Sequence, residues 1–418
     1  MNRWIRLVAA VIAMVQIANL QYAWTLFVKP LTTTVAQGGH GWSLTSVQWA
    51  FTIFIALETW AMPFTGFLID RHGARVLMTI AGLLCGVGWA LIGTSESLTQ
   101  LYMNYALAGF GAAIVYCGSM GVALKWFPDR RGLAAGLIAA GFGSGSALFI
   151  PLVRSLLSTH GYQGAFLYTG IIQGTLIVLA AQFLGGTGVP VIQAASKPQK
   201  LNVRGGSHHF ASHEMLRTPQ FYVLYAMMLM MGIGGLLATA QVAPVADNFG
   251  ISTSALALSL VVNPIANGSG RLFWGIVSDR LGREQTMLIA FTLQALSLLG
   301  VIMLGPHNPT MFVISMGMVF FTWGEVYVLF PSACADFFGS KSASSNYSFL
   351  YSTKGVASII AGGAAAALFE STHSWGPAFY GSAVLAAISA TMAIGLKKMP
   401  LPVKPAELPL SNAATAER

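Results

Sequence analysis

Two cationic residues of this chain lie inside long apolar segments. Arg271 follows Asn263-Pro-Ile-Ala-Asn-Gly-Ser-Gly in one segment, and Lys354 lies within Tyr351-Ser-Thr-Lys-Gly-Val-Ala-Ser in another. An ionised group in the core of a bilayer costs from about 3 to more than 10 kcal/mol, so it normally faces a wet cavity and has a function. We expect Arg271 and Lys354 to form a binding site for an anion.

A small carboxylate suits these two residue types. Arginine offers a planar fork that binds both oxygens of a carboxylate, and lysine adds a more mobile point charge. A dicarboxylate would cancel both charges and a monocarboxylate one, whereas the empty site would hold two cations that repel each other. In the alternative interpretation, one or both cations form structural salt bridges with an acid in an apolar segment, Glu58 or Glu325.

Aromatic and amide side chains recur near these positions at helical spacing, so that each set shares one helix face. The sets are Asn263, Asn267 and Arg271; Trp323 and Tyr327; Tyr347, Tyr351, Lys354 and Ser358; and Gln21, Trp24 and Thr25. Aromatic stripes in membrane helices also arise from packing alone. Because one stripe contains Lys354, we expect Tyr351 to line the same cavity.

The composition identifies the class of protein that must position these residues. Apolar residues make up 55% of the 418 positions and charged residues only 8%, and the mean hydropathy is +0.67. A soluble domain would carry about 25% charged residues. The chain is therefore predicted to be an all-α polytopic membrane protein.

Twelve apolar segments read as transmembrane helices in two pseudo-symmetric six-helix bundles. We expect an N-terminal bundle over 1–185, a cytoplasmic linker over 186–218, a C-terminal bundle over 219–398 and a disordered cytoplasmic tail over 399–418. The predicted helices are 5–29, 44–69, 76–94, 99–124, 131–153, 163–185, 219–246, 253–278, 285–304, 309–331, 344–370 and 375–396.

The basic residues indicate the orientation. With both termini inside, 18 of the 22 lysines and arginines fall on the inner side. This bias is typical of loops that face the cytoplasm, and it attributes the net charge of +9 to topology rather than to nucleic-acid binding. We expect a multi-pass protein of the bacterial inner membrane.

A motif repeats 209 residues apart, each time after the second helix of a bundle. Both copies read Gly-x-x-x-Asp-Arg-x-Gly with a following arginine, and we interpret them as a conformational latch in the inner loops. Its residues are Gly66, Asp70, Arg71 and Arg75 in the first copy and Gly275, Asp279, Arg280 and Arg283 in the second.

This motif pair and the six-plus-six plan resemble the major facilitator superfamily of secondary transporters. That resemblance implies a site at the midplane and alternating access by rocking of the two bundles. Closer similarity to the oxalate/formate antiporter family is carried by Gln21-Tyr-Ala-Trp-Thr-Leu-Phe27, Lys125 to Gly136, Glu214 to Phe221, Phe321 to Pro331 and the Arg271 and Lys354 segments.

The family resemblance also implies which residues bind substrate. Its two cations match Arg271 and Lys354, its aromatic cage matches Tyr22, Tyr116, Trp323 and Tyr327, and Gln21 lies nearby. Phe142 and Tyr351 depart from it, since the oxalate exchanger of the family has a tyrosine and a tryptophan there. Glu58 and Glu325 stand at positions that are uncharged in that exchanger, so each is a candidate for proton coupling, and Glu325 for contact with Lys354.

We expect a secondary active transporter of small carboxylates, best described as an oxalate:formate antiporter that works as a monomer. A proton symporter for lactate, pyruvate or formate and a sensor that does not transport are the alternatives. The sequence offers no nucleophile and base pair, metal cluster or phosphate-binding loop, so no enzyme, cofactor, catalytic residue or metal is expected.

Overall fold

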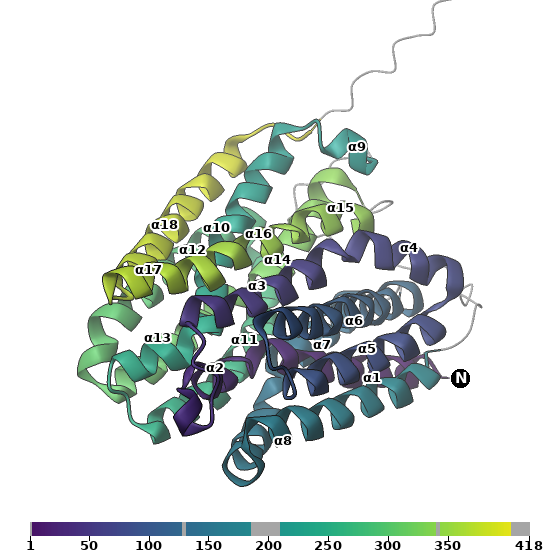
Figure 1. Cartoon of the computed structure of the whole chain (residues 1–418). Coiled ribbons are helices and arrows are strands. Elements are labelled where there is room, and N and C mark those ends of the chain that lie inside the picture. The colour runs from purple at the N-terminus through teal and green to yellow at the C-terminus, as the bar shows by residue number, and fades with distance from the viewer. Residues whose placement is uncertain (1, 128–130, 185–209, 340–342, 403–418) are drawn as a thin grey trace, which may run out of the picture.

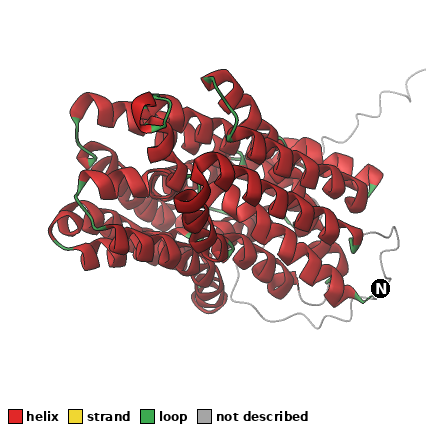
Figure 2. Cartoon of the chain, turned by 60° about the horizontal axis from the view of Figure 1, so that its bottom comes forward, coloured by secondary structure: helices red, strands yellow, loops and turns green. Residues whose placement is uncertain are grey.

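The structure is a computed structural model that describes residues 2–127, 131–184, 210–339 and 343–402. Every regular element within these ranges is a helix, and short loops join the helices (Figure 2). The helices of the first half are α1 (Arg3–Tyr22), α2 (Thr25–Thr32), a 3-10 turn (Val35–Gln37), α3 (Leu44–Trp60), α4 (Met62–His72), α5 (Ala74–Ile92), α6 (Leu98–Trp126), α7 (Arg131–Ser144) and α8 (Ser146–Gln182).

The second half begins with a short helix and ends with a long one. Its elements are α9 (Ser212–Met215), α10 (Pro219–Asn248), α11 (Thr253–Leu281), α12 (Arg283–Leu304), a 3-10 turn (Gly305–His307), α13 (Pro309–Trp323), α14 (Val326–Phe338), α15 (Ala343–Tyr351), α16 (Thr353–Ile359), a π-helical turn (Ile360–Ala364), α17 (Ala365–Thr372) and α18 (Gly376–Lys398).

Nine helical stretches of the described chain are long and apolar enough to cross a membrane. One of them, Gly136–Gln182, corresponds to two predicted helices, because Gly161 has a φ of 68° and interrupts α8. The predicted helices 44–69 and 253–278 are present as α3 with α4 and as α11 but are not among the nine. The chain is an all-α polytopic membrane protein, as its composition predicts.

Four of the predicted helices are interrupted within their length. Breaks at Ala23, Ala61, Gly324 and Ser352 separate α1 from α2, α3 from α4, α13 from α14 and α15 from α16. At the first break, Leu26 N donates to Ala23 O, a hydrogen bond over three residues in place of four. Such discontinuous helices place side chains and backbone groups at the centre of a membrane protein, where a site can form.

Two close helix pairs bring the halves of the chain together. α3 packs against α16 and the π-helical turn, and α7 packs against α11. Glycines allow this approach: a Cβ on Gly355 would lie 2.6 Å from Thr59 Oγ1, and one on Gly143 would lie 2.8 Å from Asn267 Oδ1. Residues from both halves therefore meet at one central region.

The helices run between two ends of the molecule. α2 and α17 lie at one end, and α4 and the N-terminus lie at the opposite end (Figure 1). We call the first the α2 end; the charge distribution predicts that it faces outward.

The predicted linker and tail are covered only in part, since 185–209 and 403–418 lie outside the described residues. The described residues 210–218 pack on the second half: Phe210 N donates to Phe338 O at 2.9 Å, and the two rings lie 5.7 Å apart. This stretch also contains α9, so it has more structure than the polar linker expected there. The bundle boundaries remain a prediction.

Candidate functional site

The residues predicted to bind substrate come together where the two halves meet. Lys354 on α16 and Arg271 on α11 both lie near the rings of Phe142 and Tyr327. Lys354 Nζ is 5.3 Å from the centre of the Phe142 ring and 5.9 Å from that of Tyr327. The Arg271 guanidinium is 5.7 Å from the Phe142 ring and 4.5 Å from the Tyr327 ring. The two cations thus lie beside the same two aromatic rings, which suits a small ligand held by both.

Aromatic side chains from six helices form the wall of this region. Their ring centres lie 5.3 to 6.5 Å apart. The wall consists of Tyr22 (α1), Tyr116 (α6), Phe142 (α7), Trp323 (α13), Tyr327 (α14) and Tyr351 (α15), and all are buried. Phe320 and Tyr347, which the family resemblance does not include, extend it through Tyr22 and Tyr351.

Arg271 is held by neutral acceptors. Its Nε and Nη2 donate to Asn267 Oδ1 at 3.3 and 3.1 Å, and its Nη1 donates to Ala139 O at 2.9 Å. A guanidinium has five N–H donors, so these three bonds leave two donors for a ligand. Within the described residues no carboxylate pairs with Arg271, and its side chain is 1% exposed. Arg271 is therefore a buried cation that a ligand anion could neutralise.

Lys354, unlike Arg271, is paired with a carboxylate. Its Nζ donates to Glu58 Oε2 and to Gln21 Oε1, both at 2.8 Å, and to Tyr351 OH at 3.5 Å. These bonds occupy all three N–H donors of the ammonium. The Glu58 and Lys354 side chains are 1% and 2% exposed, so this is a buried ion pair between α3 and α16. The interpretation in which an acid pairs with one cation is correct for Lys354.

The expectation that Glu325 contacts Lys354 is wrong. Glu325 is fully buried at the break between α13 and α14, and neither carboxylate oxygen has a hydrogen-bond partner within the described residues. An ionised carboxylate without a donor would cost several kcal/mol in such a place, so the environment favours the neutral acid. Glu325 does not contact the cation pair. It lies two residues from both Trp323 and Tyr327, so it is on a different side of the helical stretch from these two site residues.

Asn267 is the residue whose role the sequence indicated least clearly. Its Oδ1 accepts from Arg271 and from Tyr22 OH at 3.3 Å, and its Nδ2 donates to Phe320 O at 3.1 Å. The available signal was its position four residues before Arg271, which places both side chains on one helix face. Asn267 fixes the guanidinium and ties α11 to α1 and α13.

A polar layer closes the path from the site to the α2 end. Gln48 Nε2 donates to Ala240 O and Gln241 Oε1, both at 3.0 Å, and Thr52 Oγ1 donates to Ser358 O at 2.9 Å. Nearer the surface, Lys29 pairs with Asp247 at 2.7 Å. Each of these contacts joins the first half of the chain to the second, so the two halves are held together at the α2 end.

The two copies of the predicted latch are described to different extents. In the second copy Arg283 pairs with Asp279 at 2.9 Å and with Asp336 at 3.0 Å, while Arg280 is exposed. In the first copy Arg75 Nε donates to Gln182 Oε1 at 3.0 Å, and the side chains of Asp70 and Arg71 lie outside the described part. Latch function remains a prediction.

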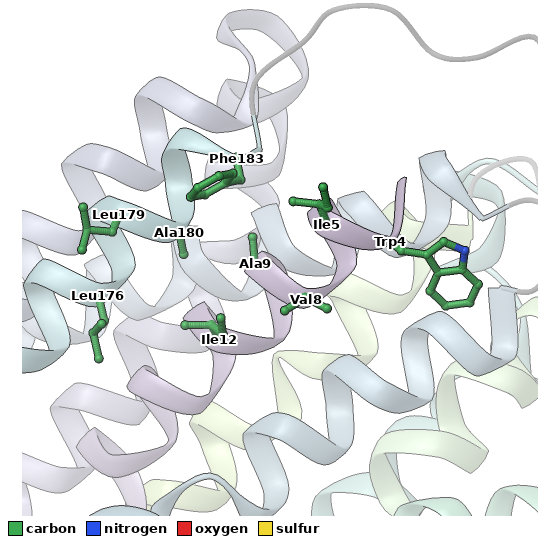
Figure 3. A pocket seen from close by; sticks show the side chains of 9 residues that line it. All are labelled: Trp4, Ile5, Val8, Ala9, Ile12, Leu176, Leu179, Ala180 and Phe183. Atoms are coloured by element: carbon green, nitrogen blue, oxygen red, sulfur yellow. The ribbon is translucent and has the colours of Figure 1, made fainter. Parts of the chain in front are cut away.

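A separate hollow of about 450 Å³ lies on the surface between α1 and α8 (Figure 3). It is lined by Trp4, Ile5, Val8, Ala9, Ile12, Leu176, Leu179, Ala180 and Phe183. All nine residues are apolar, so the hollow suits acyl chains of the surrounding lipid and offers no charge to hold a small anion.

Comparison with known proteins identifies the family. A model of the Major Facilitator Superfamily matches residues 7–243 and 223–416. The chain belongs to the Major Facilitator Superfamily. It is thus a multi-pass membrane transporter and not an enzyme.

Several curated transporters of the superfamily are similar to this chain. The oxalate:formate antiporter of Oxalobacter formigenes is 37% identical over 404 residues, which cover 96% of this chain and 94% of that protein. The uncharacterized MFS-type transporter YhjX of Escherichia coli (strain K12) is 28% identical over 368 residues, 86% of each chain. Human monocarboxylate transporter 11 is 28% identical over 240 residues, 57% of this chain and 49% of that protein.

Proposed function

We propose that this protein is a secondary active transporter of small carboxylates in the bacterial inner membrane, and that it exchanges oxalate for formate. The observation that carries the proposal is Arg271: a buried guanidinium with donors to spare, surrounded by aromatic rings and without a carboxylate partner in the described residues. The similarity over nearly the whole length to an oxalate:formate antiporter supports the same substrate class.

Transport follows from the placement of this cation between the two halves. A carboxylate that binds Arg271 neutralises it and contacts residues of both halves, so the loaded protein can reorient with less cost than the empty one. When the site is empty, the uncompensated charge opposes the change. Such a difference enforces exchange rather than leak.

A second candidate, symport of a monocarboxylate with a proton, is favoured by the Glu58–Lys354 pair. With Lys354 already neutralised, Arg271 supplies one net positive charge, which one monocarboxylate cancels. The two candidates differ in flux: a symporter takes up substrate into empty vesicles under a pH gradient, whereas an exchanger requires substrate on the inner side.

Arg271→Gln in proteoliposomes tests the proposal. We expect it to abolish counterflow of oxalate and formate without preventing membrane insertion, because no other described cation in the site has free donors. Lys354→Gln should do the same by leaving Glu58 buried without a partner. Arg217→Gln, an exposed arginine before α10, is the matched control and should transport normally. Robust oxalate counterflow by Arg271→Gln would refute the proposed site.

A further inference from the structure

Glu58 occupies the place that a second substrate carboxylate would need. Its Oε2 lies 2.8 Å from Lys354 Nζ, and the other donors of Lys354 point at Gln21 and Tyr351. A ligand anion can reach Lys354 only by replacing one of these acceptors. Since Glu58 is the charged acceptor of the three, it competes most directly with an anion.

Two polar groups beside this ion pair lack partners. Glu58 Oε1 and Gln21 Nε2 are both buried, and neither has a hydrogen-bond partner within the described residues. An unpaired carboxylate oxygen can take a proton without losing a hydrogen bond, and an unpaired amide N–H can donate to an arriving carboxylate. The geometry therefore provides a position for a proton and a donor for an anion at the same point.

Ionisable groups from several helices surround the Glu58–Lys354 pair. Besides Lys354 on α16, the ionisable groups within electrostatic range of Glu58 are Tyr22, Cys85, Tyr105, Tyr116, Tyr327 and Tyr351. Arg271 acts on Lys354 from α11. Tyrosines are neutral at neutral pH and arginine stays charged, so the ionised pair leaves the site with the single net charge of Arg271.

We propose that Glu58 sets the charge of the anion that this site accepts. When Glu58 is ionised, it holds Lys354 and the site binds a monocarboxylate at Arg271. When Glu58 is protonated, it releases Lys354 to the second carboxylate of a dicarboxylate, so binding of a dianion takes up one proton from solution. This inference rests on the proposed function and adds which substrate charge the site accepts in each protonation state of Glu58.

The test is calorimetric titration of the purified protein with oxalate and with formate, at a pH where both carboxyl groups of oxalate are ionised. Measurement in buffers of different ionisation enthalpy gives the number of protons taken up. We expect one proton per oxalate and none per formate. The apparent affinity for oxalate should then fall about tenfold for each unit of rising pH while Glu58 is ionised in the free protein, and that for formate should stay constant.

The variant Glu58→Gln removes the titrating group. We expect it to bind oxalate without proton uptake or pH dependence, and to bind formate more weakly because one positive charge stays uncompensated. Glu325→Gln is the matched control, since it changes another buried glutamate that does not contact Lys354, and it should keep the proton uptake with oxalate. The wild-type proton count decides the question by itself if Glu58→Gln does not fold.

Binding of oxalate by the wild type without proton uptake would overturn the inference. Unchanged proton uptake with oxalate in Glu58→Gln would overturn it too, as would a wild type that binds formate but no oxalate at any pH. In each of these cases the carboxylate site itself survives. If neither anion binds, nor lactate or pyruvate, the proposed function fails as well.

Discussion

The two buried cations of this transporter are equal in charge but differ in what surrounds them. Arg271 is held by an amide oxygen and a backbone carbonyl, while Lys354 is held by a carboxylate. Neutral acceptors fix a guanidinium in place without cancelling its charge, so the attraction for an anion is kept. A carboxylate partner removes that attraction until it is protonated or displaced. Arg271 therefore provides the permanent charge and Lys354 the conditional one.

The shape of the arginine side chain should matter as well as its charge. Arg271→Lys keeps the charge but cannot reach Asn267 Oδ1 and Ala139 O together, which the guanidinium does with three nitrogens. We expect formate and oxalate to bind about 10- to 100-fold more weakly, since a bidentate charged contact is replaced by a point charge.

Calorimetric titration of Arg271→Lys measures this loss, and thermal unfolding of the same sample reports stability. Arg217→Lys serves as the control, because Arg217 is exposed and lies outside the predicted helices. Equal affinity of Arg271→Lys and the wild type would mean that charge alone holds the anion.

At the scale of the helices, the site depends on interruptions and close contacts. Tyr22, Trp323 and Tyr351 are each the last residue of a helix before a break, and Lys354 is the second residue after one. The residues at these breaks keep right-handed helical dihedral angles, so each break is a local change in the hydrogen bonding of one helical stretch. Gly143 and Gly268 let α7 and α11 approach, so the guanidinium is pressed against Phe142 and Asn267.

A methyl group between α7 and α11 should disturb the cation directly. A Cβ on Gly143 would lie 2.8 Å from Asn267 Oδ1 and 3.0 Å from both Arg271 Nε and Gly268 Cα. We expect Gly143→Ala to lower the free energy of unfolding by about 1–3 kcal/mol through overpacking and to weaken carboxylate binding, both measurable on the purified protein.

Gly381→Ala on α18 is the matched control, because nothing lies within 4 Å of its Cβ. Alanine favours a helix over glycine by up to about 1 kcal/mol, so this variant should be as stable as the wild type or slightly more stable, with unchanged binding. Unchanged binding by Gly143→Ala would show that the α7–α11 contact does not position Arg271.

At the scale of the whole molecule, the two halves of the chain are joined at the α2 end. The site residues are buried, and the polar layer of Gln48, Thr52, Gln241 and Ser358 joins the halves at the α2 end. The exposed Lys29–Asp247 pair adds little energy, since surface ion pairs contribute about 0–1 kcal/mol. The buried layer and the close helix contacts must therefore contribute most of the energy that holds the halves together at this end. Both must separate before a ligand can reach the site from the α2 end.

A covalent link across the α2 end should stop the cycle. Thr25 Oγ1 accepts a hydrogen bond from Ala243 N at 3.0 Å, so the two backbones are near enough for a disulfide to be tried at Thr25→Cys with Ala243→Cys. We expect oxidation of this double variant to abolish carboxylate counterflow in proteoliposomes and reduction to restore it, because access at this end requires the halves to part.

Each single cysteine variant should transport in both oxidising and reducing conditions. Full counterflow by the oxidised double variant, with the crosslink verified by mass spectrometry, would mean that transport does not need this end to open.

The sequence by itself determined the membrane class, the helical fold and the set of residues at the centre. Hydropathy indicates most of the segments that can cross a membrane, and helical spacing tells which side chains share a face with Arg271 or Lys354. Resemblance to a transporter family added Tyr22, Tyr116 and Phe142, which no local pattern connects to the cations. The repeated Gly-x-x-x-Asp-Arg-x-Gly motif likewise indicated two related halves.

Only the tertiary structure decided which cation is paired with a carboxylate. Glu58 and Lys354 are 296 positions apart, and periodicity says which way each points but not which helix stands opposite. The close approach of α3 to α16 made Glu58 the partner of Lys354, while Glu325 is buried without a hydrogen-bond partner among the described residues. Burial makes such pairing decisive, because in a medium of low dielectric the attraction between two opposite charges is much stronger than in water.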